Sequence, residues 1–186
     1  KALTMAAGET TVSESSFARA GFLGNPSDGY FGKTVSFAFD AFKATVTLRE
    51  SEKMRFAAAE DDCSYASPGD FRRNLGLYGY YGGIRLLEAT AKKFFDWCEA
   101  HGAGLPPRNF TASFSSDIPR LVGLSGSSAI CSAMLKALMR FYGVEIPLEE
   151  SPTVCLGAER DELGISCGLQ DRVIRSEEHT SELQSH

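Results

Sequence analysis

Histidine and tryptophan are scarce in this sequence, with three and one of them among 186 residues. Two of the histidines, His179 and His186, stand near the C-terminal end, which leaves His101 as the one expected in folded structure. A single histidine does not provide a histidine-based metal site or a Ser-His-Asp triad. The five cysteines are odd in number and no two have a C-x-x-C spacing, so zinc ribbons and disulfide scaffolds are also excluded.

Long apolar runs and an excess of basic residues are absent as well. No stretch of about 18 apolar residues exists, so the sequence predicts no membrane span, and its first residues lack the apolar core of a signal peptide. The net charge is −5, whereas binding to nucleic acid or to a membrane surface needs a basic face. We therefore expect a cytoplasmic protein without a nucleic-acid or membrane partner. Nothing in the sequence indicates its oligomeric state.

Both ends of the chain differ from its middle in composition. Residues 1–15 are small and polar and are predicted to be disordered. Residues 175–186 hold one large apolar side chain, Leu183, and no periodicity. A solvated tail has this composition, but we favour a second interpretation, in which the string RSEEHTSELQSH is the translation of a sequencing-library adapter. We then expect a domain over residues 16–174, followed by an artefact tail.

The middle of the chain alternates between two hydrophobic periods. Alternating apolar residues predict strands, and apolar residues at helical spacing predict helices. The predicted strands are 17–23, a hairpin of 35–39 and 42–48 around Asp40-Ala41, 54–56 and 110–114. The predicted helices are 80–100, 128–142 and 148–163, the last ended by Gly164. Hairpins mixed with helices favour an α+β fold over a doubly wound sheet.

A glycine- and serine-rich loop joins the strand 110–114 to the helix 128–142. Its residues are Gly123, Leu124, Ser125, Gly126, Ser127 and Ser128. A helix start presents N–H groups and the positive end of the helix dipole to an anion, and glycines let the backbone approach a phosphate closely. The loop is not a Walker A loop, because GK[ST] is absent. Taken alone, such a loop has a plain alternative, a serine that caps a helix after a turn.

Three motifs in order make the sequence resemble a known family. The string GLSGSSA after Pro119 resembles the ATP-binding motif of the GHMP kinases, named for galactokinase, homoserine kinase, mevalonate kinase and phosphomevalonate kinase. ARAGFLGNPSDGYFGK at 18–33 resembles the family's substrate motif, and AERDELGISCGLQDRV at 158–173 resembles the segment with its metal-binding Glu and catalytic Asp. Together with YGYYGGIRLL, these strings are most similar to plant glucuronokinase over about residues 16–174.

This resemblance implies a fold and a reaction. The expected fold is the two-layer α+β arrangement of the GHMP kinase N-terminal domain, of the ribosomal protein S5 domain 2-like type. The expected activity is transfer of the γ-phosphoryl group of ATP, with Mg²⁺, to the anomeric hydroxyl of D-glucuronate, which gives glucuronate 1-phosphate for UDP-glucuronate synthesis. The family also has a C-terminal domain with a third glycine-rich motif. That domain is missing here, so we expect these residues alone to be inactive.

Roles for single residues follow from the same resemblance. The loop from Gly123 to Ser128 is expected to bind the nucleotide phosphates, and Ser128 and Glu159 are expected to bind Mg²⁺. Asp171 is the expected catalytic carboxylate, with Arg19 as its cationic neighbour. Whether Asp171 takes the proton or only orients the hydroxyl stays open, and so does a plain helix-capping role.

The sugar itself is the least determined part of the resemblance. Asn25 and Asp28 are expected to contact sugar hydroxyls. Galactokinases have a Glu-His pair where this chain has Asn25-Pro26, which argues against galactose. The alternatives are an inactive fragment, or a kinase for galactose, fucose or a heptose. Nothing selects the cation for a uronate carboxylate from the candidates Lys33, Arg72, Arg73, Arg85 and Arg120.

Overall fold

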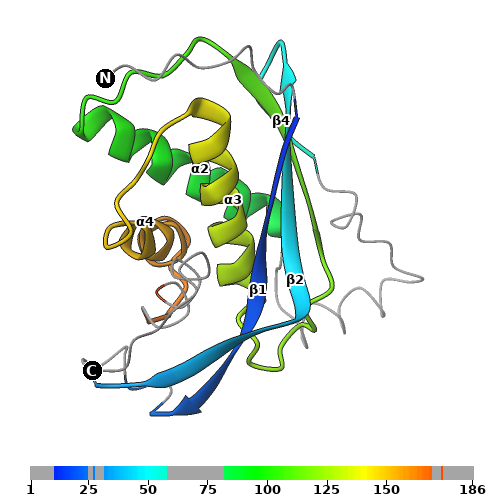
Figure 1. Cartoon of the computed structure of the whole chain (residues 1–186), viewed down its shortest axis with the longest axis vertical. Coiled ribbons are helices and arrows are strands. Elements are labelled where there is room, and N and C mark those ends of the chain that lie inside the picture. Colours follow the sequence, from blue (N-terminus) through cyan, green and yellow to red (C-terminus); the bar gives the residue numbers. More distant parts are fainter. Residues whose placement is uncertain (1–10, 25–26, 28–31, 58–81, 169–172, 174–186) are drawn as a thin grey trace.

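The computed structural model describes residues 11–24, 27, 32–57, 82–168 and 173. Its elements, in chain order, are β1 (Thr11–Leu23), β2 (Val35–Ser51), β3 (Arg55–Phe56), α2 (Gly83–Ala100), β4 (Asn109–Ser116), α3 (Gly126–Tyr142), α4 (Ser151–Gly157) and the π-helical turn η2 (Ala158–Glu162). One face of the sheet carries α2 and α3, with α4 packed beside them (Figure 1). The predicted α+β class is therefore confirmed. None of the helices among these residues is both long and apolar enough to span a membrane.

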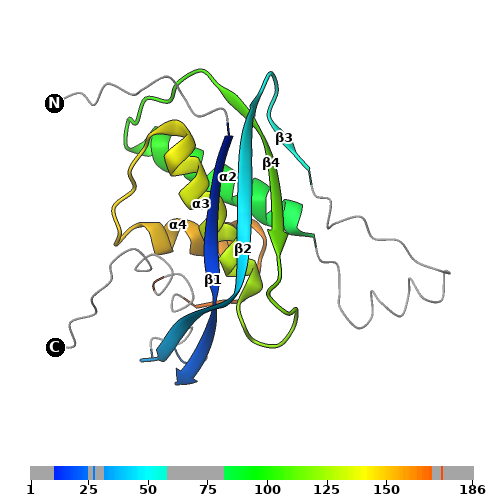
Figure 2. The same cartoon turned by 45° about the vertical axis from the view of Figure 1, so that its right-hand side comes forward.

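The four strands form one mixed sheet in the order β1-β2-β4-β3. β1 pairs antiparallel with β2, β2 antiparallel with β4, and the short β3 lies parallel to β4 at the far edge (Figure 2). Cross-strand hydroxyl pairs support the first ladder, with 2.8 Å between Ser13 Oγ and Thr47 Oγ1 and 2.8 Å between Ser15 Oγ and Thr45 Oγ1.

The predicted hairpin inside 35–48 is wrong. Asp40 and Ala41 lie within the continuous strand β2, where the register jumps from Phe17 opposite Lys43 to Ala18 opposite Phe39. Neither of the two turn residues has the positive φ that a tight two-residue hairpin needs, so the extra residues form a bulge instead. The antiparallel partner of β2 along this stretch is β1, the strand that precedes it in the chain.

The predicted disorder of residues 1–15 is also wrong in part. β1 begins at Thr11, and Val12, which lies opposite Leu48, is buried in the core. The small polar residues Ser13 and Ser15 are ordered because they pair with Thr47 and Thr45 of β2, contacts that composition does not reveal. Residues 1–10 and the expected tail 175–186 lie outside the described residues.

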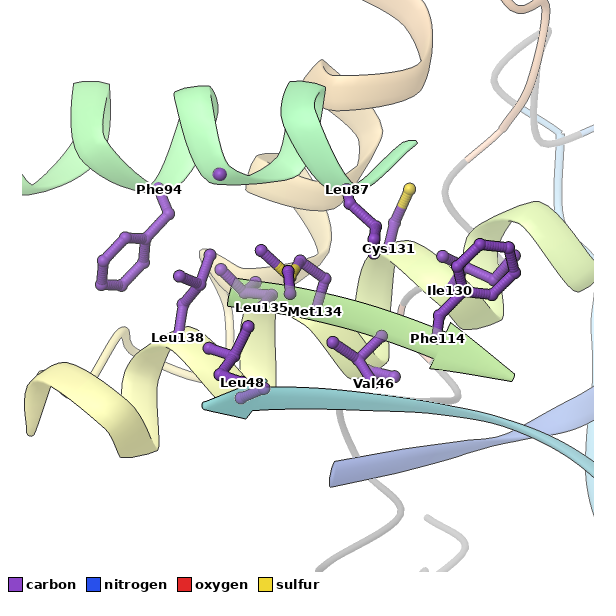
Figure 3. Close-up of a cluster of buried hydrophobic side chains, with 14 of the residues drawn as sticks. Val46, Leu48, Leu87, Phe94, Phe114, Ile130, Cys131, Met134, Leu135 and Leu138 are labelled. Atoms are coloured by element: carbon purple, nitrogen blue, oxygen red, sulfur yellow. The ribbon is translucent and has the colours of Figure 1, made fainter. Parts of the chain in front are cut away.

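The core fills the space between the sheet and its helices. Figure 3 shows Val46 and Leu48 of β2 facing side chains of α3 and α2, among them Leu138 and Phe94. α3 is buried along most of its length, which explains why its apolar residues spread beyond one stripe. α3 ends at Gly143, whose φ of 67° is the left-handed conformation that favours glycine.

The predicted helix 148–163 is present as two pieces. α4 covers Ser151–Gly157, and the chain then widens into the π-helical turn η2 before ending at Gly164, with a φ of 65°. The N–H group of Ile165 donates to the carbonyl of Glu159 at 2.8 Å and closes this end. Single π-helical turns occur frequently at functional sites.

Candidate nucleotide and metal site

The loop before α3 has an unusual backbone. Leu121, Gly123 and Ser125 have φ values of 61°, 79° and 56°, so every second residue is in a left-handed conformation. When residues of left-handed and right-handed conformation alternate, successive backbone N–H groups point toward one side of the chain. They then form a concavity that binds anions. A left-handed leucine or serine costs about 1–3 kcal/mol and persists only where the surrounding structure imposes it.

Contacts with the sheet hold this loop at both ends. At its start, the carboxylate of Asp117 accepts the backbone N–H of Lys43 at 2.6 Å. At its end, the N–H of Arg19 in β1 donates to the carbonyl of Leu124 at 3.3 Å. The carbonyl of Ser125 then accepts the first helical hydrogen bond, from Ala129 at 3.1 Å. The loop therefore reaches the start of α3 in a fixed conformation.

The first turn of α3 is suited to a negatively charged ligand. It contains no acidic residue, and the side chain of Ser125 does not cap the helix. A Cβ added at Gly123 would meet no atom within 4 Å, so that side of the loop is open. A phosphate placed there would meet helix N–H groups and the positive end of the dipole.

Ser128 and Glu159 meet directly behind this loop. Ser128 Oγ of α3 donates to Glu159 Oε2 of η2 at 3.0 Å, and the two residues are 2% and 1% exposed. A carboxylate is expensive to bury unless partners compensate its charge. Residues 31 positions apart in the sequence are thus brought together.

The donor chemistry of this pair fits Mg²⁺. A hydroxyl and a carboxylate are hard oxygen ligands, and Mg²⁺ in nucleotide sites takes one or two protein ligands and leaves the rest to phosphates and water. In the described part of the chain, no three His, Cys, Asp or Glu side chains gather closely enough to form a metal site of their own. A metal held by Ser128 and Glu159 would leave positions for phosphate oxygens and water.

The other expected site residues divide into two groups. Arg19 is 3% exposed and lies in β1, joined to the loop through its backbone. Asn25, Asp28 and Asp171 lie outside the described residues, so the expected meeting of Ser128, Glu159 and Asp171 is tested for its first two members only. Of the possible cations for a uronate, Lys33, Arg85 and Arg120 are exposed.

Sequence reasoning missed two features of the site. The first is the left-handed conformation of Leu121 and Ser125, because neither residue type signals it. The second is a pair of lysines, Lys92 and Lys93 of α2, which form ion pairs with the acidic residues of η2. Hydrogen bonds from these lysines hold the pKa of Glu162 below its ordinary value. Two adjacent lysines in a predicted helix do not indicate which acidic residues they pair with.

Comparison with known families settles the relationship of the chain. Residues 85–175 match the family model of the GHMP kinases N terminal domain. The chain contains a GHMP kinase N-terminal domain. The fold that the sequence motifs imply is thereby confirmed, and the matched GHMP kinase segment includes the loop before α3 and the Ser128–Glu159 pair.

Curated and solved GHMP kinases extend the comparison. The chain is 48% identical over 162 residues to Probable glucuronokinase 2 of Arabidopsis thaliana, covering 85% of this chain and 44% of the relative. It is 45% identical over 166 residues to Glucuronokinase 1 of the same plant, covering 87% and 46%. Mevalonate kinase of Methanococcus jannaschii shares the fold, with a TM-score of 0.67 and 18% identity over 89% of this chain and 50% of that chain. The chain thus spans less than half the length of either plant relative.

Proposed function

We propose that the full-length protein containing this chain is an ATP-dependent sugar kinase that phosphorylates the anomeric hydroxyl of D-glucuronate. The observation that carries the kinase part is the fixed loop before α3, with its alternating backbone, set beside the buried Ser128–Glu159 pair. The identity of 45% and 48% to two plant glucuronokinases supports the choice of sugar.

The loop and the buried Ser128–Glu159 pair would bind different parts of the metal–nucleotide complex. The N–H groups of residues 123–127 would hold the phosphates, and Ser128 and Glu159 would hold Mg²⁺. When bound, the metal neutralises charge on the phosphate oxygens, which is the main requirement of phosphoryl transfer. The protein supplies a rigid frame for both, because the loop is hydrogen-bonded to the sheet and Glu159 is held by Ser128.

The transfer step needs a group that handles one proton. The anomeric oxygen forms a bond to the γ-phosphorus while the bond between that phosphorus and the leaving ADP oxygen breaks, and the hydroxyl proton leaves. We assign the proton to the carboxylate of Asp171, with the cationic Arg19 keeping that carboxylate ionised. Asn25 and Asp28 would hold the sugar hydroxyls.

The test is an assay of the full-length protein with a panel of sugars. ADP formation from MgATP should be fastest with D-glucuronate, and phosphorus NMR should show an anomeric phosphate in the product. The 1-O-methyl glycoside of glucuronate has no free anomeric hydroxyl, so it should give no reaction. A faster reaction with galactose, fucose or a heptose would show that D-glucuronate is not the preferred substrate. Reaction with the glycoside would show that the phosphorylated hydroxyl is not the anomeric one.

A further inference from the structure

A compact set of charges joins α2 to η2. Lys92 Nζ lies 2.7 Å and Lys93 Nζ 3.2 Å from the same oxygen, Oε1 of Glu162. Lys93 Nζ also lies 3.8 Å from Oδ2 of Asp161. We call these four residues the α2–η2 clamp.

The stem of Lys93 adds a packing contact to these ion pairs. A Cβ built at Gly157, the last residue of α4, would lie 3.3 Å from Lys93 Cε and 3.3 Å from Asp161 Oδ2. The side chain of Lys93 therefore crosses the chain where α4 widens into η2. The clamp holds the π-helical turn through both its charges and this close approach.

The turn held by the clamp is the one that carries Glu159. Glu159 contacts α3 through Ser128, while Glu162, three residues later, contacts α2 through both lysines. A shift of η2 along α2 would move the Glu159 carboxylate relative to Ser128. We infer that Lys93 and Glu162 are positioning residues that set the Glu159 carboxylate for the metal-bound nucleotide; this inference rests on the proposed function.

A purely structural role would give a different signature. The four side chains of the clamp are partly exposed, and exposed ion pairs contribute little to the free energy of unfolding. Hydrogen-bond partners of a metal ligand typically change metal affinity by about 10- to 100-fold when they are removed. Lys93 and Glu162 act on Glu159 one step further away, through the backbone of η2, so we expect an effect near the lower end of this range. The clamp should therefore affect metal-dependent binding more than thermal stability.

The experiment measures binding to the full-length protein by calorimetry, with a nonhydrolysable ATP analogue in the presence and absence of Mg²⁺. Glu162→Gln and Lys93→Met, which keeps the stem over Gly157, should each weaken binding of the Mg²⁺ complex about tenfold. Binding of the metal-free analogue should stay within about twofold, and the Tm within about 2 °C. Lys93→Arg keeps the charge and should bind like the parent.

Two further variants serve as references. Asp96→Asn removes the ion pair of 3.2 Å between Lys92 and Asp96 within α2, and it should change none of these values. Glu159→Gln should weaken binding of the Mg²⁺ complex at least as much as Glu162→Gln. If Glu159→Gln weakens it and Glu162→Gln does not, the clamp is not a positioning device although the proposed site stands. If the parent shows no preference for the Mg²⁺ complex, the proposed function fails and this inference with it.

Discussion

The two ends of α3 differ in the kind of contact that each makes, apolar at the C-terminal end and polar at the N-terminal end. At the C-terminal end, Phe141 and Tyr142 pack at a 5.1 Å centroid separation, and their rings meet Phe110 and Phe94 at 5.8 Å and 5.9 Å. At the N-terminal end, the buried contact is between the polar groups of Ser128 and Glu159.

The backbone follows the same division. The C-terminal end finishes at a glycine, which adopts its φ of 67° without steric cost. The N-terminal end is entered through Leu121 and Ser125, which adopt similar φ values of 61° and 56° against their preference. One end is therefore held by apolar packing, while the other combines left-handed residues with a buried hydroxyl and carboxyl group.

The largest expected effect is on catalysis, through the carboxylate that the family resemblance assigns to the reaction at the N-terminal end of α3. In the full-length protein, Asp171→Asn should lower kcat about 100- to 10,000-fold, because the amide cannot take the hydroxyl proton. The amide has nearly the same shape, so sugar and nucleotide affinities should change little. Steady-state kinetics and calorimetric titration measure the two quantities. A kcat within a few-fold of the parent would remove Asp171 from the mechanism.

Substitutions at the C-terminal end of α3 should instead lower the stability of the protein. Phe141→Ala removes a ring that is 1% exposed and is covered by the guanidinium of Arg108 at 3.9 Å from its centroid. Loss of the ring should lower the free energy of unfolding by about 3–5 kcal/mol, measured by urea denaturation. Leu148→Ala, at an exposed leucine, should change it by less than about 0.5 kcal/mol. Equal effects of the two variants would show that the aromatic cluster is not the stabilising end.

A matched pair of glycines compares the ends directly. Gly123 and Gly143 have φ values of 79° and 67°, so alanine at either position should cost about 1–2 kcal/mol in unfolding free energy. Only Gly123→Ala should also weaken binding of the nucleotide analogue, because its Cβ would occupy open space beside the loop that we propose binds the phosphates. If Gly143→Ala weakened nucleotide binding as much, binding would depend on global stability and not on the loop.

The smallest expected effect is on the pH dependence of stability, through two groups near the C-terminal end of α3. Burial raises the pKa of the Cys98 thiol above 9.0 and that of the Tyr142 hydroxyl above 10.0. Above pH 9 the unfolded chain loses these protons before the folded chain does, so stability should fall as pH rises. Cys98→Ala should flatten this slope in Tm measured from pH 8 to 10.5. If the slope of Tm against pH were unchanged in this variant, the loss of stability at high pH would come from groups other than the Cys98 thiol.

Much of the fold could be predicted from periodicity. The helices at 80–100 and 128–142 were confirmed as α2 and α3 because apolar residues recur at helical spacing in both, although α3 is buried on more than one side. The hairpin around Asp40-Ala41 was wrong because alternation on both sides of a break describes a bulged strand as well as two strands. Pairing partners distinguish the two, and they are far away in the sequence.

The meeting of Ser128 and Glu159 was predictable because the motifs name both residues, whereas their roles stay predictions. The string from Gly123 to Ser128 predicted a phosphate loop, and family resemblance added Glu159, which the structure places 3.0 Å from Ser128. The left-handed Ser125 and the ion pairs of Lys93 were not predictable. They depend on how the sheet and α2 impose a conformation on segments whose composition is ordinary.

The central claim is that the N-terminal end of α3 binds the phosphates of a metal-bound nucleotide. A crystal structure of the full-length protein with Mg²⁺ and a nonhydrolysable ATP analogue tests it most directly. We predict phosphate oxygens within hydrogen-bonding distance of the N–H groups of residues 123–127, and the metal next to Ser128 Oγ and the Glu159 carboxylate. A nucleotide bound with its phosphates away from this loop, or a metal coordinated by neither side chain, would contradict the account.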